Sequence, residues 1–131
     1  MIVVDASVLV AALGDDGHSG QIARRRLRDE NLVAPEIIDL EVTSVLRRMV
    51  ASRLVSDVRG DQAVLDLVSI RMTRVPHRLV VNRCWDLRKN STPYDAAYIA
   101  VAEAFQLKLV TADAKLAGVP GTKCEVELVA D

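Results

Sequence analysis

The sequence predicts an α/β fold in which helices cover both faces of a central parallel sheet. Half of the 131 residues are hydrophobic but only 3% are aromatic. The core must therefore be built from Val, Leu, Ile and Ala, as in helices packed on a parallel sheet. Short apolar segments alternate with helical segments along the chain, which is the pattern of β-α-β units. The length suits one domain spanning residues 1–131, with three α/β/α layers and about five strands.

Each element is recognised by its hydrophobic period and its boundary residues. The strands are expected at Ile2–Val4, Leu32–Ala34, Ile70–Val75, Lys108–Thr111 and Cys124–Leu128. The helices are expected at Ala6–Leu13, His18–Asp29, Pro35–Arg53, Ser56–Val68, Arg78–Arg88, Tyr94–Leu107 and Asp113–Ala117. Pro35 is placed in the first turn of its helix, where proline is favoured. Ser56 is expected to cap the helix that follows it.

Composition excludes several broad classes of protein. No stretch approaches the roughly 20 apolar residues that span a bilayer. The apolar run Met1–Val4 ends at Asp5 and has no basic leader, so a signal peptide is not expected. Cys84 and Cys124 lack the paired spacing of a zinc site and are expected to be thiols in a reducing compartment. We therefore expect a cytoplasmic protein with no membrane partner.

The net charge of −1 hides an uneven distribution of basic residues. Most of the 17 basic residues are Arg, and several lie close together in the sequence. The clusters are Arg24, Arg25, Arg26 and Arg28, then Arg47 and Arg48, then Arg71, Arg74 and Arg78. Arginine suits bidentate contacts with phosphate, but solvated helix faces explain such clusters equally well. Charge alone leaves a nucleic-acid partner open.

Three aspartates stand at the starts of predicted helices. Asp5 follows the first strand, Asp113 follows the fourth, and Asp95 lies in the first turn of the Ala-rich helix. Each has an ordinary explanation, because Asp at a helix start caps free N–H groups and suits the positive end of the helix dipole. Thr92 and Asp95 even have the spacing of a capping box. Taken singly, each position favours capping over catalysis.

Glu41 is different, because it lies on the core-facing stripe of its helix. Ile37, Val42 and Val45 recur at helical spacing, and Glu41 falls between Ile37 and Val45. A buried carboxylate without a partner is costly, so something must compensate its charge. Arg48, two turns further on, is one candidate, and a metal ion is the other. We favour the metal ion.

The predicted fold strengthens the case for a metal site. In an open parallel sheet, ligands collect beyond the carboxyl ends of the strands, near the point where strand order reverses. If the first and fourth strands are neighbours, Asp5 and Asp113 meet there, and Asp95 and Glu41 can approach from their helices. Four like charges in one pocket repel each other unless a cation binds. An all-oxygen site suits Mg²⁺ or Mn²⁺, which could orient a water molecule and polarise a phosphodiester.

Two hydroxyl residues are expected to support these acids. Ser7 and Thr111 each lie two residues from a predicted ligand and can hydrogen-bond it, although cap or turn roles explain them equally well. No competing catalytic scheme is apparent, since the chain has no GxSxG, Gly-rich phosphate loop or HExxH motif. His18 and His77 have no obvious partner and are expected at the surface.

With these residues placed, the sequence resembles the PIN domain, and within it the VapC toxins. The resemblance covers nearly the whole chain. It rests on the order and spacing of four segments, Ile2–Ser7, Pro35–Val42, Tyr94–Ala100 and Leu109–Leu116. The family's acidic metal ligands correspond to Asp5, Glu41, Asp95 and Asp113, and its conserved hydroxyl corresponds to Thr111.

The resemblance implies a five-stranded parallel sheet and metal-dependent hydrolysis of RNA phosphodiester bonds, with tRNA or rRNA as the substrate. It also implies a homodimer and a cognate VapB-like antitoxin whose C-terminal segment blocks the site. The polar segment Asn90–Pro93 departs from the hydrophobic or small-residue lead that the family usually shows. That rim of the site is therefore expected to differ.

Three other classes were weighed against this interpretation. A phosphoaspartyl receiver needs an Asp after the third strand, where this chain has Arg74–His77. A haloacid-dehalogenase-type enzyme needs DxD after the first strand, where position 7 is Ser. A non-catalytic PIN-like scaffold that binds RNA or protein remains the alternative. Loss of an acid would favour it, and all four acids are present.

Overall fold

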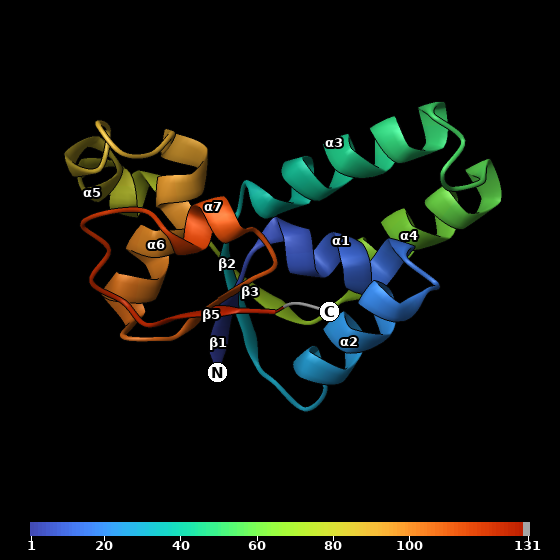
Figure 1. The fold of residues 1–131 in the computed structure, drawn as a ribbon, viewed down its shortest axis with the longest axis horizontal. Coiled ribbons are helices and arrows are strands. Elements are labelled where there is room, and N and C mark those ends of the chain that lie inside the picture. The colour runs from blue at the N-terminus through green and yellow to red at the C-terminus, as the bar shows by residue number, and fades with distance from the viewer. Residues whose placement is uncertain (130–131) are drawn as a thin grey trace.

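A computed structural model describes residues 1–129 and contains a five-stranded sheet with helices on both sides (Figure 1). Every strand pair is parallel, and the spatial order is β3-β2-β1-β4-β5. The strands are β1 (Ile2–Val4), β2 (Leu32–Pro35), β3 (Met72–Val75), β4 (Leu109–Thr111) and β5 (Val126–Leu128). The predicted α/β class and the sheet of about five parallel strands are confirmed. Positions 130 and 131 of the predicted domain lie outside the described residues.

The face of the sheet that a helix covers depends on the direction in which the chain crosses from one strand to the next. They are α1 (Ala6–Gly14), α2 (His18–Leu27), α3 (Ile38–Ala51), α4 (Asp57–Ser69), a 3₁₀ turn η1 (His77–Val80), α5 (Val81–Asp86), α6 (Pro93–Phe105) and α7 (Ala114–Ala117). Parallel crossovers are right-handed, so the reversal after β3 sends the later helices to the other face. Figure 1 shows α1 and α2 on one side of the strands and α5 and α6 on the other.

Helix α6 is the most deeply buried helix and fixes one face of the site. Every residue from Ala96 to Ala102 is buried, and the helix contacts β1, β2 and β4. Small alanine side chains let its backbone lie close to the strands, while Ile99 and Val101 fill the remaining space. Because Asp95 begins this buried stretch, its position relative to the sheet is set by core packing.

The strand order reverses between β1 and β4, which are direct neighbours. Val4 pairs with Val110 in the ladder, and the backbone N–H of Asp5 donates to the carbonyl of Val110 at 3.0 Å. The predicted adjacency of the first and fourth strands is therefore present. It brings the carboxyl ends that carry Asp5 and Asp113 to one edge of the sheet, where ligands bind in such folds.

Two predicted elements differ from the structure. Pro35 was expected to open the long helix, but it ends β2 opposite Val75, and α3 begins only at Ile38. A proline is tolerated at this last position because the next donor of the ladder is the Glu36 N–H, which bonds the Val75 carbonyl at 2.9 Å. The helix predicted over 78–88 is divided into η1 and the short α5. Other boundaries shift by a few residues, as helix and strand ends commonly do.

Two expectations from composition concern membrane-spanning helices and the two cysteines. Within residues 1–129, no helix combines the length and apolar character needed to cross a bilayer. Cys84 and Cys124 are both free, and burial raises the pKa of the Cys84 thiol above its ordinary value.

The corner between α1 and α2 depends on a close backbone approach at Gly20. A Cβ atom added there would lie 1.8 Å from the carbonyl oxygen of Asp15. That same oxygen accepts a hydrogen bond at 2.7 Å from Arg24, which also bonds the Ala12 carbonyl at 3.0 Å. Arg24 thus satisfies free carbonyls at the end of α1, and Gly20 leaves room for the turn that makes this contact.

We expect Gly20→Ala to destabilise the protein by about 3 kcal/mol or more, because the backbone must move to relieve the clash. Gly118→Ala is the matched control, since a Cβ there makes only ordinary contacts, the nearest at 3.5 Å. It should change the free energy of unfolding by less than about 1 kcal/mol. Urea denaturation followed by circular dichroism measures both, and equal stabilities would contradict the proposed packing.

Candidate active site

Asp5 is held at the end of β1 by donors that all reach one of its oxygens. The side chain is 6% exposed and caps α1. Its Oδ2 atom accepts bonds from the Ser7 N–H at 3.3 Å, the Ser7 hydroxyl at 2.5 Å and the Thr111 hydroxyl at 2.9 Å. Oδ1 accepts none of these bonds. The carboxylate is therefore fixed in orientation while one oxygen is kept available.

Ser7 and Thr111 join the ends of β1 and β4 into one network. The Ala112 N–H donates to the Ser7 hydroxyl oxygen, and the Asp113 N–H donates to the Thr111 hydroxyl oxygen, both at 3.0 Å. The two hydroxyl oxygens lie 3.4 Å apart. Sequence reasoning singled out both hydroxyls, but it did not show that Thr111 reaches across to Asp5. This contact exists only because the two strands are paired.

The expectation that aspartates cap helices also holds for Asp113. Its Oδ1 accepts the Lys115 N–H at 2.9 Å at the start of α7. Asp95 behaves differently. The Thr92 hydroxyl caps α6 by accepting a bond from the Asp95 N–H at 3.3 Å, but within the described part of the chain the Thr92 N–H donates no return bond to the Asp95 carboxylate. The capping box is half formed, and capping does not explain the Asp95 side chain.

Glu41 is partly buried, and its partner is a residue that sequence reasoning had not singled out for this role. The hydroxyl of the buried Tyr98 donates to Glu41 Oε1 at 2.5 Å. Arg48, the alternative partner considered above, is exposed and donates to the Ser44 hydroxyl instead. Tyr98 could have been noticed as a side chain with a polar tip, one turn after Asp95, on the apolar face of α6. Burial, together with Glu41, raises the pKa of this phenol, so Tyr98 remains a donor.

The four predicted acids act on one another electrostatically. Burial raises the pKa of Glu41, and the charges of Asp5 and Asp95 raise it further, against the opposing effect of the Tyr98 hydrogen bond. Burial also raises the pKa of Asp95, with further contributions from Asp5 and Asp113 and an opposing one from Lys115. Each of the four carboxylates thus takes part in a shared negative field.

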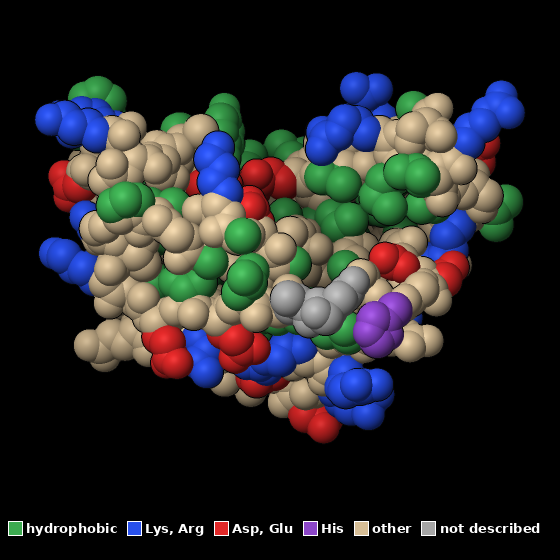
Figure 2. Space-filling model, in the orientation of Figure 1, with side chains coloured by type: hydrophobic (Ala, Val, Ile, Leu, Met, Phe, Trp, Pro, Cys, Tyr) green, Lys and Arg blue, Asp and Glu red, His purple; other side chains and the backbone are tan. Residues whose placement is uncertain are grey.

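Acidic side chains are visible at the surface in Figure 2. Acidic side chains lie in a notch between the part of the molecule formed by α5–α7 and the part formed by α3. Within residues 1–129, no three His, Cys, Asp or Glu side chains are gathered closely enough to hold a metal ion. The donors are nevertheless of the right chemistry, because carboxylate oxygens are the ligands of hard divalent cations. Asp5, Glu41, Asp95 and Asp113 would gain from such an ion, because its positive charge offsets the burial and the mutual repulsion that raise the pKa values of Glu41 and Asp95.

The arginine clusters separate into structural and exposed side chains. Arg26 pairs with Glu30 and Glu127, and Arg74 forms a bidentate pair with Asp39. Others remain exposed and form no ion pair within the described part of the chain, notably Arg25, Arg28, Arg47, Arg48, Arg71 and Arg78. The arginine clusters in the sequence therefore contain both structural arginines that form ion pairs and exposed arginines that do not. Of the two histidines, both exposed, His77 lies 3.4 Å from Glu36.

The sequence pattern of the PIN domain matches residues 2–121. The chain belongs to the PIN-domain family. Two similar proteins are ribonucleases of Mycobacterium tuberculosis. VapC1 is 39% identical over 128 residues, covering 97% of this chain and 96% of the relative. VapC12 is 38% identical over 130 residues, covering 99% and 100%. This PIN domain is therefore a member of the VapC group, and the resemblance noted in the sequence is confirmed.

A solved structure supports the same fold. A chain of VapBC2 from Rickettsia felis, solved bound to a DNA fragment, superposes on this PIN domain with a TM-score of 0.70. The match covers 99% of this chain and 100% of that chain at 15% sequence identity. At such low identity the comparison concerns the fold, which is that of a PIN domain.

The raised pKa of Glu41 predicts how stability depends on pH without metal. A carboxyl whose pKa is higher in the folded state than its ordinary 4.5 binds its proton more tightly when folded. The contribution of Glu41 to stability is therefore fully present below pH 4.5 and is lost as the pH rises through the raised value. Asp95 contributes in the same direction from its ordinary 3.8. In EDTA, this contribution should lower the melting temperature as the pH rises through this window, while arginine-paired acids such as Glu30 and Glu127, whose pKa values are lowered, act in the opposite direction.

Glu41→Gln should reduce this fall, because the amide carries no charge and can still accept the Tyr98 hydrogen bond. Glu36→Gln, an exposed change outside the acid group, should retain it. Thermal denaturation across the pH series compares the three proteins. Identical slopes for wild type and Glu41→Gln would show that Glu41 does not carry the predicted charge penalty.

Proposed function

We propose that this chain is a metal-dependent endoribonuclease toxin of a VapBC-type toxin–antitoxin pair. The observation that carries the proposal is the shared field of four carboxylates at the carboxyl edge of the sheet, together with membership of the VapC group. Relatives at 38–39% identity are named ribonucleases. The nuclease occupies residues 1–131 as a single domain, and we place it in the cytoplasm.

Asp5, Glu41, Asp95 and Asp113 are the proposed ligands of the metal, which we propose to be Mg²⁺ or Mn²⁺. When bound, such an ion polarises the phosphodiester and supplies an activated water molecule. The chain's own residues orient the ligands. Ser7 and Thr111 fix Asp5, while Tyr98 holds Glu41 toward the core.

Basic side chains beside the notch supply affinity for RNA. Figure 2 shows Lys and Arg side chains on either side of the acidic group. Arg47 and Arg48 are exposed on α3, and Lys115 on α7 is close enough to lower the pKa of Asp95. Phosphates of the substrate, which we propose to be tRNA or rRNA, would contact these cations while the scissile bond approaches the acids.

Exposed apolar side chains on and beside α4 suit a protein partner. Val58, Leu65 and Val68 on this helix and the preceding Leu54 are all largely exposed. Contiguous exposed apolar surface marks interaction sites, and a VapB-like antitoxin helix is the partner we propose for it. A homodimer is the proposed state of the toxin itself. A non-catalytic scaffold is less well supported, since Asp5, Glu41, Asp95 and Asp113 are all retained.

Removal of divalent metal should abolish cleavage. The purified protein, free of antitoxin, is incubated with total RNA, and the cleavage ends are read by sequencing. EDTA should stop the reaction, and Mg²⁺ or Mn²⁺ should restore it where Zn²⁺ does not, because all four proposed ligands are oxygen donors. Full cleavage after exhaustive chelation would remove the metal mechanism.

Asp5→Asn separates a metal ligand from a helix cap. Asparagine caps as well as aspartate and can accept the same bonds from Ser7 and Thr111. The metal-free melting temperature should therefore stay equal or rise, because one repelling charge is gone. Single-turnover cleavage should fall by about 100-fold or more, because the ion loses a charged ligand.

Asp61→Asn is the matched control for this change. Asp61 is exposed on α4 and forms no ion pair among residues 1–129, so both its stability and its cleavage rate should match wild type. Cleavage by Asp5→Asn at the rate of this control would refute the proposed site.

A further inference from the structure

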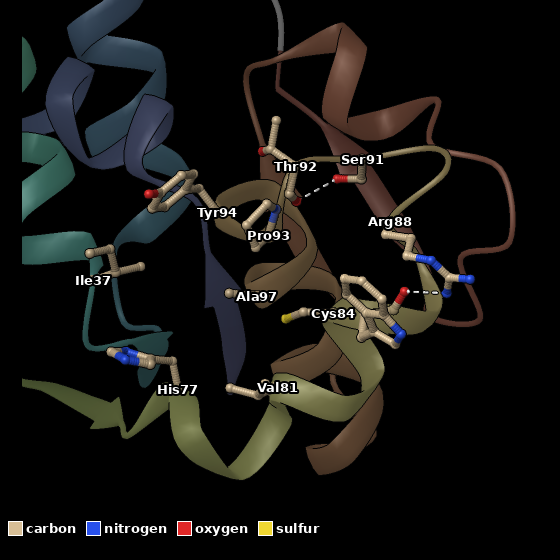
Figure 3. Close-up of a pocket in the computed structure, with 11 residues that line it drawn as sticks. Ile37, His77, Val81, Cys84, Arg88, Ser91, Thr92, Pro93, Tyr94 and Ala97 are labelled. Atoms are coloured by element: carbon tan, nitrogen blue, oxygen red, sulfur yellow. Dashed lines mark hydrogen bonds between the residues drawn. The ribbon is translucent and has the colours of Figure 1, made fainter.

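A cavity of about 590 Å³ lies next to the acidic group, between the starts of α3 and α6 and the helix α5. Figure 3 shows Ile37 and Tyr94 on one side of it and Arg88 on the other, with Cys84 and Ala97 between them. Its lining is predominantly apolar. This cavity takes no part in the arrangement that holds the four acids, so its shape and composition need a separate explanation.

Two of the three exposed aromatic side chains, Trp85 and Tyr94 but not Phe105, line the cavity. The protein has one Trp, two Tyr and one Phe. Tyr98 is buried beside Glu41, whereas Trp85 and Tyr94 both line the cavity and are 66% and 59% exposed. Two exposed aromatic side chains on one concave apolar surface suit a flat, apolar-faced ligand.

A cation and hydroxyl groups complete the wall. The guanidinium carbon of Arg88 lies 4.6 Å from the centre of the Trp85 ring. Arg88 also donates to the Trp85 carbonyl at 3.1 Å and forms no ion pair within the described residues. Its charge therefore remains available for a phosphate. Ser91 and Thr92 add hydroxyls to the same wall, in the segment whose polarity departs from the family pattern.

The cavity and the acids share the same two helix starts. Tyr94 immediately precedes Asp95, and Ile37 accepts the backbone hydrogen bond of Glu41 at 3.0 Å. A single RNA strand suits both places, because it carries planar rings on a chain of phosphodiesters. We propose that the cavity receives one unpaired base of the RNA substrate, next to the phosphate that is cut. This inference rests on the proposed nuclease function.

The shape of the surface favours a base over a protein partner. The cavity is concave and its lining includes Trp85 and Tyr94, whereas the exposed apolar side chains on α4 lie along a helix surface, which suits a partner helix. Stacking on aromatic rings tolerates any base, so this site contributes affinity and places the strand relative to the acids. The edges of the base face Ser91 and Thr92, which can distinguish one base from another.

Trp85 is the only tryptophan, so its fluorescence reports on the cavity directly. The full chain carrying Asp5→Asn, in which cleavage is expected to be about 100-fold slower, is titrated with short single-stranded homopolymers of each of the four ribonucleotides. An oligomer of ribose phosphate without bases is the control ligand. At least one homopolymer should quench the fluorescence to saturation, and the base-free oligomer should not. Absence of quenching by all four homopolymers would overturn the proposal.

Variants of two exposed rings on α6 provide a second measurement. Tyr94→Leu should weaken binding of the quenching RNA by about tenfold or more, because one stacking face is lost. Phe105→Leu alters an exposed ring, 49% exposed, at the far end of the same helix and should leave affinity unchanged. Equal affinities for the two variants would overturn the proposal.

Two further outcomes are distinguishable from these. In the first, Trp85 fluorescence changes with protein concentration but not with RNA, and Tyr94→Leu changes the sedimentation of the protein. This result would assign the cavity to a second copy of the chain and overturn the proposal. Wild-type cleavage of total RNA with metal is measured in parallel. Intact cleavage with an unresponsive Trp85 would refute only the base site, while absence of cleavage would refute the nuclease function itself.

Discussion

Three of the four acids at the carboxyl edge of the sheet are held by neutral donors, which sets them apart from most other buried or partly buried acids among the described residues. Hydroxyl and backbone N–H groups contact Asp5, Glu41 and Asp113, and none of the four site acids has an ion pair within residues 1–129. Neutral donors fix the direction of a carboxylate without cancelling its charge. The negative field therefore survives folding and is available to a cation.

Elsewhere in the molecule, acids are neutralised by arginine. Glu30, Glu127 and Glu103 accept charge-assisted bonds that lower their pKa values. Arg26 and Arg83 make these pairs at distances of 2.6–2.8 Å. The repulsion at the site is tolerated because the apolar sheet and the buried length of α6 stabilise the fold independently of it. Because arginines pair with acids elsewhere but not at the site, the net charge of −1 does not describe the local charge that a partner meets.

In the proposed function, the acids carry out the reaction, and different residue types around the same notch bind the substrate. The acids occupy the ends of β1 and β4 and the first turns of α3 and α6, whereas two aromatic side chains and the Arg88 guanidinium, which lies over the Trp85 ring, line the cavity. The proposed RNA substrate suits both, because it is negatively charged along its backbone and carries flat bases. The α5–α6 region, where the sequence departs from the family pattern, is where differences in RNA selection are expected to arise.

Local signals in the sequence determined the helices and strands, and they located Asp5, Asp113 and Asp95 at the starts of helices because capping acts within three or four residues. The hydrophobic period also placed Glu41 toward the core. Pro35 was misplaced because its environment depends on its pairing with Val75 in another strand. Only the tertiary structure decided that Thr111 bonds Asp5, 106 residues away, and that Tyr98 rather than Arg48 meets Glu41, 57 residues away. Such contacts follow from the order of the strands and the packing of α6 on the sheet, which no window of a few residues contains.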